Sequence, residues 1–581
     1  MRRNSMRRQC QPAPAHPGSS FRRSVWPLGS RLEANIRPAK PADSVTVRYV
    51  NTGWNYADVW EAIAESIPDH VAQVHGSRRD TWQQFDQRAD GLALSLLEVG
   101  AERDDKVAIY LRNVPEYMET FFAALKISCV PVNTNYRYGP DELTYLWTNA
   151  DAIAVVFHGE YTPLVDRVRV QASAIRLWVH VNDGTHPCPD WATPYTMAAA
   201  PSPLRVAAPW DRSADDLIFI YTGGTTGMPK GVMWRQRDLY AHANAGTPVD
   251  PDDQDLDHVR SRAGKLTPAL LPASPLMHGT GMTMGIAALR IGGTNVLLEG
   301  HGFDAIECLD VLEREQCYGI SIVGDAFARP MLRALEAAPT RWNLEHVQLV
   351  ASAGVMWSHE VKQGLLEFLP NASLGDGFAS SEAFGMGGST SKRGDVATTA
   401  TFTLGDKARV ITDDGRDVDP GSGEVGLVAV GGPQPLGYYK DDEKTARTFR
   451  IIDGERYSMP GDYATIEADG SLTLLGRGSV CINTGGEKVF PEEVEEAIKT
   501  HPDVRDAIVV GVADDRFGEA ITAVVEADRA LALDELRDHV KQRLAAYKAP
   551  KHLLLVESTL RAPNGKADYP GWRTRAAAAL T

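Results

Sequence analysis

The sequence predicts an α/β protein: a large N-terminal body of βαβ-layered sheets plus a β-rich subdomain, followed by a small, mobile α+β C-terminal lid. Three observations indicate this. From Tyr56 onward, segments with helical apolar spacing alternate with short apolar runs typical of buried strands. After residue 400, short strands are separated by Gly and Asp turns. A glycine-containing joint at residues 476–479 then precedes roughly 100 residues of α+β pattern, enough for a small domain.

The elements of the body alternate as βαβ units require. Apolar spacing predicts helices over residues 59–67, 82–99 and 116–127, and apolar runs predict strands over 107–111, 130–133, 154–157, 216–220, 294–298 and 319–323. Because this alternation joins neighbouring strands of the same direction, we expect mainly parallel sheets. In the second helix, Leu94 is expected on the core side with Phe85, Leu92, Leu96 and Leu97.

The later part of the chain changes character. Strands are predicted over residues 407–410, 426–430, 463–467 and 471–475, as in an antiparallel meander. Beyond the joint, Pro491 is expected to begin a helix whose Glu492, Glu493 and Glu495 complement the helix dipole. A further helix is predicted over 534–546. We therefore expect a tail over residues 1–45, an N-terminal domain over 46–478 and a lid over 479–581.

Composition excludes several classes of protein. The net charge of −16 disfavours a nucleic-acid surface, and no apolar run approaches the roughly 18 residues of a membrane span. Six scattered cysteines favour reduced thiols in the cytoplasm over a disulfide framework or zinc site. The first 45 residues are rich in arginine and lack an apolar core, so they are interpreted as a disordered tail or an early start of translation rather than a secretory signal; a transit peptide is the alternative.

Residues 220–234 carry the most informative motif. Thr222, Gly223, Gly224, Thr225, Thr226 and Gly227, with Lys230 nearby, follow a predicted buried strand. Consecutive backbone N–H groups, hydroxyls and an ammonium are the donors that hold polyphosphate. The spacing does not fit G-x-x-x-x-G-K-[ST], so this is not a Walker A loop. The alternative is a glycine-rich hairpin with a surface lysine.

Four further segments, in order, resemble the adenylate-forming acyl-CoA synthetase superfamily, which includes acyl-CoA ligases, luciferase and peptide-synthetase adenylation domains. They are 376–382 (Asp-Gly-Phe-Ala-Ser-Ser-Glu), 460–462 (Pro-Gly-Asp), 476–477 (Gly-Arg) and 561–566 (Arg-Ala-Pro-Asn-Gly-Lys). With the glycine loop, the resemblance covers roughly residues 50–570. It implies that the N-terminal domain is the AMP-binding domain, and that the substrates are ATP, CoA and a small-molecule carboxylic acid.

The resemblance assigns a role to each segment. Residues 222–227 wrap the ATP phosphates with help from Lys230, and Thr226 counts among the catalytic residues. Phe378 stacks on adenine beside Asp376 and Gly377, Ser381 contacts phosphate, Glu382 holds Mg²⁺, and Gly354 belongs to a small-residue turn beneath the nucleotide. The sequence departs from the family at Gly223, Ala379 and Ser381, where the family usually has Ser, Gly and Thr.

The remaining segments complete the implied site. Asp462 accepts both ribose hydroxyls and Arg477 binds the ribose, just before the pivot at Ser479. Lys566 sits between the attacking carboxylate and the α-phosphate. After the lid rotates, Gly486 leaves room for the pantetheine thiol, and Lys488 assists with the CoA nucleotide. His278 matches a family position where it gates or orients the carboxylate, although a structural role is equally consistent with a lone histidine.

The implied reaction is ATP-dependent acyl-CoA formation through an acyl-adenylate. Residues 277–284 and 322–330, rich in Gly, Ala, Met and Phe, are expected to line a pocket for a medium- to long-chain fatty or steroid side-chain acid, since several runs resemble an actinobacterial subgroup of ligases that includes such enzymes. The alternatives are an acyl-AMP ligase that loads a carrier protein without CoA, and a non-catalytic nucleotide-binding module. The sequence leaves the oligomeric state and the contacts of Ser479 open.

Overall fold

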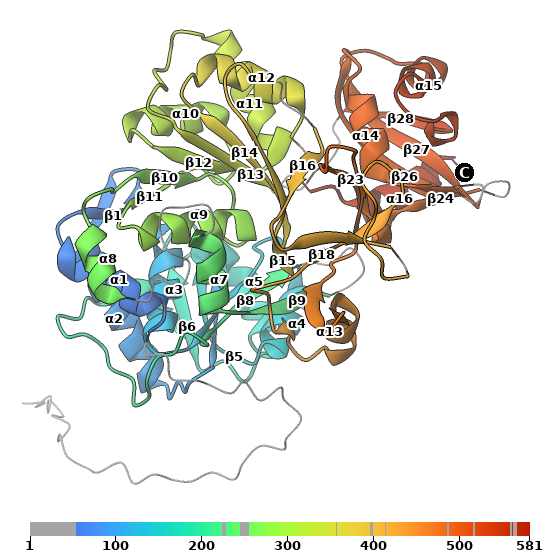
Figure 1. Cartoon of the computed structure of the whole chain (residues 1–581). Coiled ribbons are helices and arrows are strands. Elements are labelled where there is room, and N and C mark those ends of the chain that lie inside the picture. Colours follow the sequence, from blue (N-terminus) through green and yellow to red (C-terminus); the bar gives the residue numbers. More distant parts are fainter. Residues whose placement is uncertain are drawn as a thin grey trace, which may run out of the picture. The chain divides into compact units, whose positions relative to one another are not determined.

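A computed structural model describes the chain over residues 54–222, 228–244, 255–355, 357–395, 399–412, 414–484, 487–514, 518–557, 561 and 566–580. The predicted tail over 1–45 lies outside these residues. Within them, three β-sheets are flanked by helices, which confirms the α/β class (Figure 1). None of the described helices combines the length and apolar composition that crossing a bilayer requires.

The first sheet has eight strands. Its order is β19 (Gly437–Tyr438), β9 (Lys230–Arg235), β8 (Leu217–Thr222), β4 (Val130–Asn133), β3 (Lys106–Tyr110), β5 (Ala152–His158), β6 (Leu177–Val181) and β7 (Thr193–Pro194). From β8 through β4 to β7 the strands run parallel, whereas β8, β9 and β19 pair antiparallel. The predicted parallel core therefore ends in an antiparallel edge.

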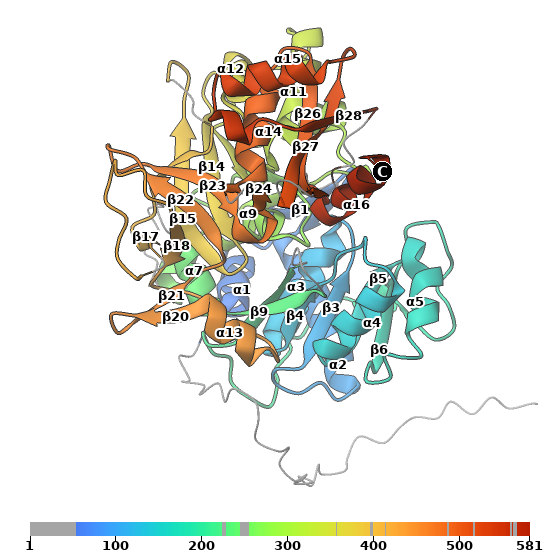
Figure 2. The ribbon, with the colours of Figure 1, turned by 90° about the vertical axis from the view of Figure 1, so that its right-hand side faces the viewer.

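Helices cover both faces of this sheet. The helices that precede and surround it are α1 (Tyr56–Ser66), α2 (Trp82–Glu98), α3 (Pro115–Lys126), α4 (Pro140–Asn149), α5 (Thr162–Val168) and α6 (Tyr195–Ala198). Because side chains alternate along a strand, Val107 and Ile109 of β3 join the apolar core with Phe122 of α3, while Tyr110 meets Trp147 of α4 at 5.8 Å between ring centres (Figure 2).

The second sheet continues from parallel to antiparallel. Its parallel part is β1 (Val71–His75), β11 (Thr294–Leu297), β10 (Ala269–Pro272), β12 (Gly319–Ile322), β13 (Leu349–Ala353) and β14 (Ser373–Ser380), with β2 (Arg78–Thr81) at the edge. The antiparallel part is β15 (Ala383–Ser391), β16 (Thr401–Leu404), β23 (Leu472–Arg477), β22 (Asp462–Ile466), β18 (Gly426–Val430), β17 (Ala408–Ile411), β21 (Glu455–Ser458) and β20 (Phe449–Ile452). This second part contains the antiparallel strands expected after residue 400, but not in the order of a meander, since β16 pairs with β23 and β18 with β22.

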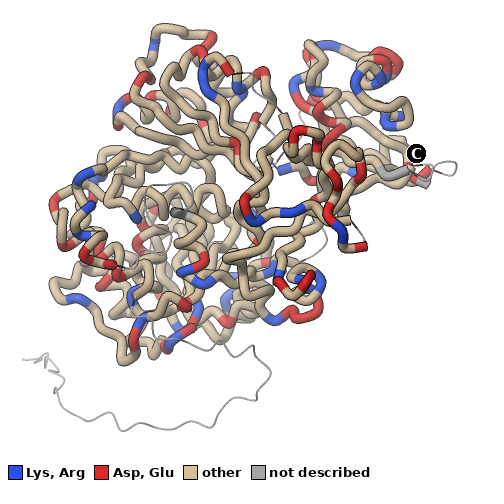
Figure 3. Tube along the Cα trace, viewed as in Figure 1, with Lys and Arg blue, Asp and Glu red and all other residues tan. Residues whose placement is uncertain are grey.

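Helices also accompany the second sheet. They are α7 (Gln236–Asn244), α8 (Leu256–Arg262), α9 (Gly279–Arg290), α10 (Ala305–Arg314), α11 (Gly324–Ala337), α12 (His359–Phe368) and α13 (Asp442–Thr448). Residues of α10, α11 and α12 share one apolar cluster with β12, β13 and β14. In Figure 3, Lys, Arg, Asp and Glu are coloured, and long tan stretches of the trace carry none of them.

The third sheet belongs to residues 479–581, which we name the C-terminal segment. It contains β25 (Glu487–Val489), β24 (Ile482–Thr484), β27 (Gly518–Ala527), β26 (Val504–Asp514) and β28 (His552–Val556). Its helices are α14 (Pro491–Lys499), α15 (Leu533–Lys541) and α16 (Tyr569–Leu580). Pro491 occupies the first turn of α14, as predicted, where its missing N–H leaves no helical bond unmade.

Two local expectations were wrong. Leu94 is 39% exposed, because α2 turns this position away from the core that takes Phe85 and Leu92. The helix predicted over 534–546 is shorter: α15 ends at Lys541, and a separate 3₁₀ turn covers Ala546–Lys548. The segment 376–382 is the end of strand β14 with the turn after it. At the joint, β23 runs through Arg477 and a single 3₁₀ turn follows over Gly478–Val480.

A buried lysine joins the first three helices. Lys126 of α3 is 1% exposed, and its ammonium contacts Glu61 of α1 at 2.8 Å and Asp86 and Asp90 of α2 at 2.6 and 2.8 Å. Three N–H donors thus meet three carboxylates. Arg212 adds a second cation at Glu61, 2.7 Å away. These charges are stable inside the protein only as a complete set, since an isolated buried ion is strongly unfavourable.

We expect Lys126→Met to lower the free energy of unfolding by about 3–5 kcal/mol, because it leaves carboxylates buried without their shared cation. Urea-induced unfolding, followed by tryptophan fluorescence, measures the change in the free energy of unfolding. Lys440→Met is the matched control: Lys440 pairs with Asp151 at the surface, at 45% and 53% side-chain exposure, and should change stability by less than about 1 kcal/mol. Equal stability of the two variants would contradict the prediction.

Candidate active site

A cavity of about 420 Å³ lies where β8, β12 and β13 end. Part of its lining is apolar and includes Leu270, Met284, Ala287, Leu349 and Ala351. Another part, which we name the polar part, is formed by Thr222, His278, Ser381 and Lys566. Ligands of open α/β sheets bind at the carboxyl ends of the strands, which is where this cavity lies.

Two asparagines position the loop that leads into α9. Asn113 donates to the carbonyls of Pro272 and Ser274, each at 3.0 Å, and accepts from the N–H of Leu276 at 2.7 Å. Asn133, at the end of β4, donates to the carbonyl of Met277 at 2.6 Å.

The same Asn133 side chain also fixes the end of β8. It donates to the carbonyl of Tyr221 at 2.9 Å and accepts from its N–H at 2.6 Å. Gly281 allows the first turn of α9 to approach closely, since a Cβ there would lie 2.3 Å from the carbonyl oxygen of Pro275. Strand end, loop and helix are therefore locked to one another around the cavity.

His278 stands immediately before α9 and lines the cavity. Burial lowers the pKa of its imidazole to about 3, and the positive charges of Lys566 and Arg137 act in the same direction. The ring is therefore neutral at physiological pH. It can donate or accept a hydrogen bond, but it supplies no positive charge to a bound anion.

The glycine-loop motif joins two antiparallel strands. Thr222 at the end of β8 pairs with Lys230 at the start of β9. Gly223, Gly224, Thr225, Thr226 and Gly227 lie outside the described residues, so their predicted roles stay predictions. The two strands on either side of these residues pair as a hairpin, which is the backbone arrangement of the alternative interpretation of this motif. Lys230 forms an ion pair with Asp441, the residue that caps α13.

The segment 376–382 contributes Ala379, Ser380 and Ser381 to the cavity and directs the side chains of Asp376 and Phe378 elsewhere. Asp376 is buried, and its carboxylate accepts from Lys362 of α12 at 2.8 Å; burial raises the pKa of this carboxyl group. Phe378 stacks on Phe402 of β16 at 5.5 Å between ring centres. Asp376, Gly377 and Phe378 are absent from the lining of the described cavity.

Glu382 is held from two sides. Its carboxylate oxygen Oε1 accepts from the Tyr438 hydroxyl at 2.7 Å, and its backbone carbonyl accepts from the Ser458 hydroxyl at 2.7 Å. Trp234 donates to the neighbouring carbonyl of Ser381 at 2.9 Å. Glu382 is buried, with 8% of the residue exposed. Its carboxylate oxygens are therefore held in place next to Ser381 of the polar part.

Asp462 and Arg477 come together through strand pairing. They are direct partners in the β22–β23 register, although 15 positions separate them in the sequence. Asp462 is buried at 5% exposure. Gly486 lies outside the described residues, and the side chains of Arg477 and Lys488 are not described. Of the predicted site residues, the cavity thus unites Thr222, His278, Gly354, Ser381 and Lys566.

Of the two stretches predicted to line the acyl pocket, one lines the cavity and the other is almost entirely outside its lining. Residues 277–280, 283 and 284 line the cavity, whereas of residues 322–330 only Val323 does so. The remainder of that stretch forms α11, and its Phe327 lines a separate cavity of about 50 Å³. The helix begins directly after β12, which turns these side chains away.

Several residues of the site were missed from the sequence. Tyr438 and Asp441, which contact Glu382 and Lys230, occur in the run Gly-Tyr-Tyr-Lys-Asp at 437–441. The two adjacent tyrosines after a glycine are the sequence feature from which these residues could have been identified. Ala287, Leu349 and Ala351 carry no signal of their own, because isolated apolar residues in helices and strands are normally core residues.

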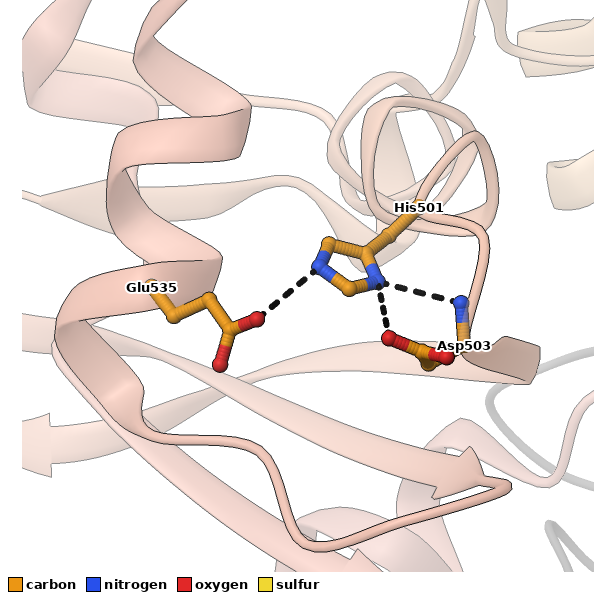
Figure 4. A group of neighbouring side chains, drawn as sticks. All are labelled: His501, Asp503 and Glu535. Carbon is orange, nitrogen blue, oxygen red and sulfur yellow. Dashed lines mark hydrogen bonds and ion pairs between the residues drawn. The ribbon is translucent and has the colours of Figure 1, made fainter.

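One group of possible metal ligands occurs in the described part of the C-terminal segment: His501, Asp503 and Glu535 (Figure 4). Its members are already paired. The N–H of Asp503 donates to Nδ1 of His501 at 3.2 Å, and Arg529 forms ion pairs with both carboxylates. The guanidinium occupies the place a cation would take, so this group is interpreted as an ion-pair network.

We expect the Lys566→Ala variant to raise the pKa of His278, because removing a nearby positive charge favours the imidazolium form. The ring should nevertheless remain neutral above about pH 5, since burial is the largest cause of the shift. Histidine-selective NMR titration, assigned with His278→Gln, measures both values. Lys230→Ala removes a lysine that is not among the causes and serves as control. An inflection of His278 near its ordinary value would contradict the burial seen here.

Comparison with known proteins agrees with this architecture. The sequence model of the AMP-binding enzyme family matches residues 60–439, and that of the AMP-binding enzyme C-terminal domain matches residues 493–566. The medium/long-chain-fatty-acid–CoA/3-oxocholest-4-en-26-oate–CoA ligase of Mycolicibacterium smegmatis is 40% identical over 89% of this chain and 95% of its own. The 3-oxocholest-4-en-26-oate–CoA ligase of Rhodococcus rhodochrous is 40% identical over 89% and 94%.

Solved structures show the same fold at lower identity. The anthranilate CoA ligase AuaEII in complex with anthranoyl-AMP has a TM-score of 0.77 at 21% identity, covering 91% of this chain and 99% of its own. ATP-bound MatB from Rhodopseudomonas palustris has a TM-score of 0.74 at 24% identity, covering 91% and 100%. The chain therefore belongs to the AMP-binding enzyme family, within the adenylate-forming superfamily of acyl-CoA synthetases.

Proposed function

We propose that this enzyme joins a medium- or long-chain fatty acid, or a steroid side-chain acid, to CoA at the expense of ATP. The acid's carboxylate attacks the α-phosphorus of ATP and pyrophosphate leaves. The CoA thiol then attacks the carbonyl carbon of the acyl-adenylate and AMP leaves. The observation that carries the proposal is one cavity in which apolar residues adjoin the four polar residues, Lys566 among them.

The cavity supports the choice of acid. A polar part can hold a carboxylate while Leu270, Met284 and Leu349 surround an aliphatic or alicyclic body. Methionine adapts to irregular apolar shapes, and Ala287 and Ala351 leave space that larger side chains would fill. The two ligases that are 40% identical to this chain are named for a fatty or steroid side-chain acid of this kind.

The residues of the polar part have separate tasks. Lys566 offsets the negative charge that develops between the carboxylate and the α-phosphate. His278, neutral and fixed before α9, orients the carboxylate by hydrogen bonding without competing with Lys566 for it. Thr222 and Ser381 offer hydroxyl donors to the phosphates. Each contribution depends on placement within about half an ångström. The locked loop and strand end supply that placement for His278 and Thr222.

The nucleotide is expected to lie along β14, β22 and β23. Phe378 provides a ring for adenine, and Asp462 and Arg477, neighbours across the strand pair, hold the ribose. Asp376, bound to Lys362, supports this strand from beneath rather than meeting the ligand directly. Residues 223–227 and Lys230 are assigned to the leaving pyrophosphate, for which Lys230 exchanges its partner Asp441.

Glu382 fits the requirements of Mg²⁺. A magnesium ion takes oxygen ligands, and it is normally shared between one or two carboxylates and the phosphates of the nucleotide. The buried carboxylate, oriented by Tyr438, offers such oxygens beside Ser381. When bound, the ion would neutralise phosphate charge. Tyr438 keeps the carboxylate in one orientation and so prepares the site before the ion arrives.

The C-terminal segment is proposed to act as a lid that pivots at Ser479. Such a motion would withdraw Lys566 and bring residues 485–488, with Gly486 and Lys488, toward the CoA thiol. We also propose that the enzyme works in the cytoplasm, since the five described cysteines are all free thiols.

Assays with a panel of carboxylic acids test the proposed function. We expect the purified protein to catalyse ATP–pyrophosphate exchange with medium- and long-chain fatty acids and with steroid side-chain acids, and to release the CoA thioester and AMP when CoA is added, as measured by mass spectrometry. Exchange confined to acetate or aromatic acids would overturn the choice of substrate. Adenylate formation without any thioester would instead favour an acyl-AMP ligase that loads a carrier protein.

The role of Tyr438 gives a second test. We expect Tyr438→Phe to raise the Mg²⁺ concentration for half-maximal exchange about tenfold, because the carboxylate of Glu382 loses the hydroxyl that orients it. The rate at saturating Mg²⁺ should change much less. Tyr439→Phe is the matched control, since the Tyr439 hydroxyl donates to Asp151 instead, at 2.7 Å. Identical Mg²⁺ dependence in the two variants would argue against Glu382 as the ligand.

A further inference from the structure

The stretch that carries Lys566 is held at both ends. Arg561 precedes Lys566 by five positions and Tyr569, the first residue of α16, follows it by three. Both side chains reach the same buried carboxylate, that of Glu495 on α14. Helices α14 and α16 both pack on β26, so both ends of the stretch are attached to elements that contact this one strand (Figure 1).

Glu495 is built into the interior. It is 3% exposed, and its Oε1 accepts from the backbone N–H of Val509 on β26 at 2.9 Å. Burial raises the pKa of this carboxyl group, and the charge of Arg561 opposes that shift. The sequence predicted only that Glu495, like Glu492 and Glu493, complements the dipole of this helix. Here the helix turns the third member of the run inward instead.

Arg561 is fixed by three acceptors. Its guanidinium pairs with Asp506 at 2.5 Å, donates to the carbonyl of Ala507 at 2.7 Å, and lies 3.5 Å from Oε2 of Glu495. The arginine side chain is only 15% exposed. Such a network removes the freedom that a long side chain otherwise has, so the backbone at residue 561 is tied to β26.

Tyr569 provides the other attachment. Its hydroxyl forms a hydrogen bond with Glu495, which is among the causes that raise the pKa of this tyrosine. Its ring packs with Trp572 of α16 against Val510 and Val524 of the sheet. The carboxylate therefore receives a donor from each side of the catalytic lysine.

We propose that Glu495 is a positioning residue for Lys566: by holding Arg561 and Tyr569 together, its carboxylate sets where the ammonium enters the cavity. The inference rests on the proposed role of Lys566 in adenylation. Lys566 lines the cavity, between these two attachments in the sequence. Anchoring both ends of a short stretch is the physical means of reducing its freedom.

The two half-reactions separate positioning from general stability. Adenylation requires Lys566 in the cavity, whereas attack of CoA on the acyl-adenylate does not. We expect Glu495→Gln, which keeps the size of the side chain but removes the charge that pairs with Arg561, to slow ATP–pyrophosphate exchange about 10- to 100-fold. Thioester formation from a synthetic acyl-adenylate and CoA should stay within about threefold of the unsubstituted enzyme.

Two further variants sharpen the test. Tyr569→Phe deletes only the hydroxyl and should slow exchange about 3- to 10-fold. In the double variant the two effects should combine to less than their product, because both act on the same stretch. Glu493→Gln is the matched control: it lies on the same helix and pairs with Lys548 at the far side from this network, so it should leave the ratio of the two half-reactions unchanged.

The outcomes are distinguishable. A selective loss of exchange in Glu495→Gln, not shared by Glu493→Gln, supports the proposal. Equal losses in both half-reactions, matched by Glu493→Gln and by a lower melting temperature, would show that Glu495 only stabilises the fold. If Lys566→Ala abolishes exchange while Glu495→Gln leaves it intact, the positioning role is wrong and the proposed function stands. Full exchange in Lys566→Ala would overturn the role of the lysine itself.

Discussion

The cavity depends on one buried side chain, Asn133. Its amide binds both backbone groups of Tyr221 and the carbonyl of Met277, and so ties the end of β8 to the loop before α9. A buried amide must be hydrogen-bonded to be tolerated, and these three bonds meet that need only in this arrangement of strand and loop. With that junction fixed, His278, Thr222 and the apolar lining have defined positions. Asn113 reinforces the same loop from β3's side.

Several buried charges in the described part of the chain are paired across elements. Lys126 meets three carboxylates, Lys362 meets Asp376, and Glu495 meets Arg561. Each set joins elements that are distant in the sequence, because a buried ion is stable only when its partner is delivered by the fold. Lys566, in contrast, lines the cavity, whereas Lys126 and Lys362 are buried and paired with carboxylates. Position along the chain does not distinguish these two kinds of lysine.

Polar and apolar residues of the active site serve different parts of the substrate. A neutral imidazole, an ammonium and several hydroxyls, among them those of Thr222 and Ser381, line the same cavity as Leu, Met and Ala side chains, so the acid's charged and apolar ends meet matching surroundings. The carboxylate of Glu382 is oriented by Tyr438, which comes from the same short run as the partner of Lys230. A segment of five residues thereby supports both the predicted metal ligand and the predicted phosphate-binding lysine.

The sequence by itself determined the α/β class, the order of most strands and helices, and the five segments that mark the family, because apolar periodicity and turn residues act locally. Tertiary structure decided the rest. Leu94 is exposed, and Asp376 pairs with Lys362, because packing chooses which face of an element is covered. Strand register placed Asp462 beside Arg477, and helix α14 turned Glu495 toward Arg561 and Tyr569. These contacts join residues that are far apart in the chain, so no local sequence pattern could predict them.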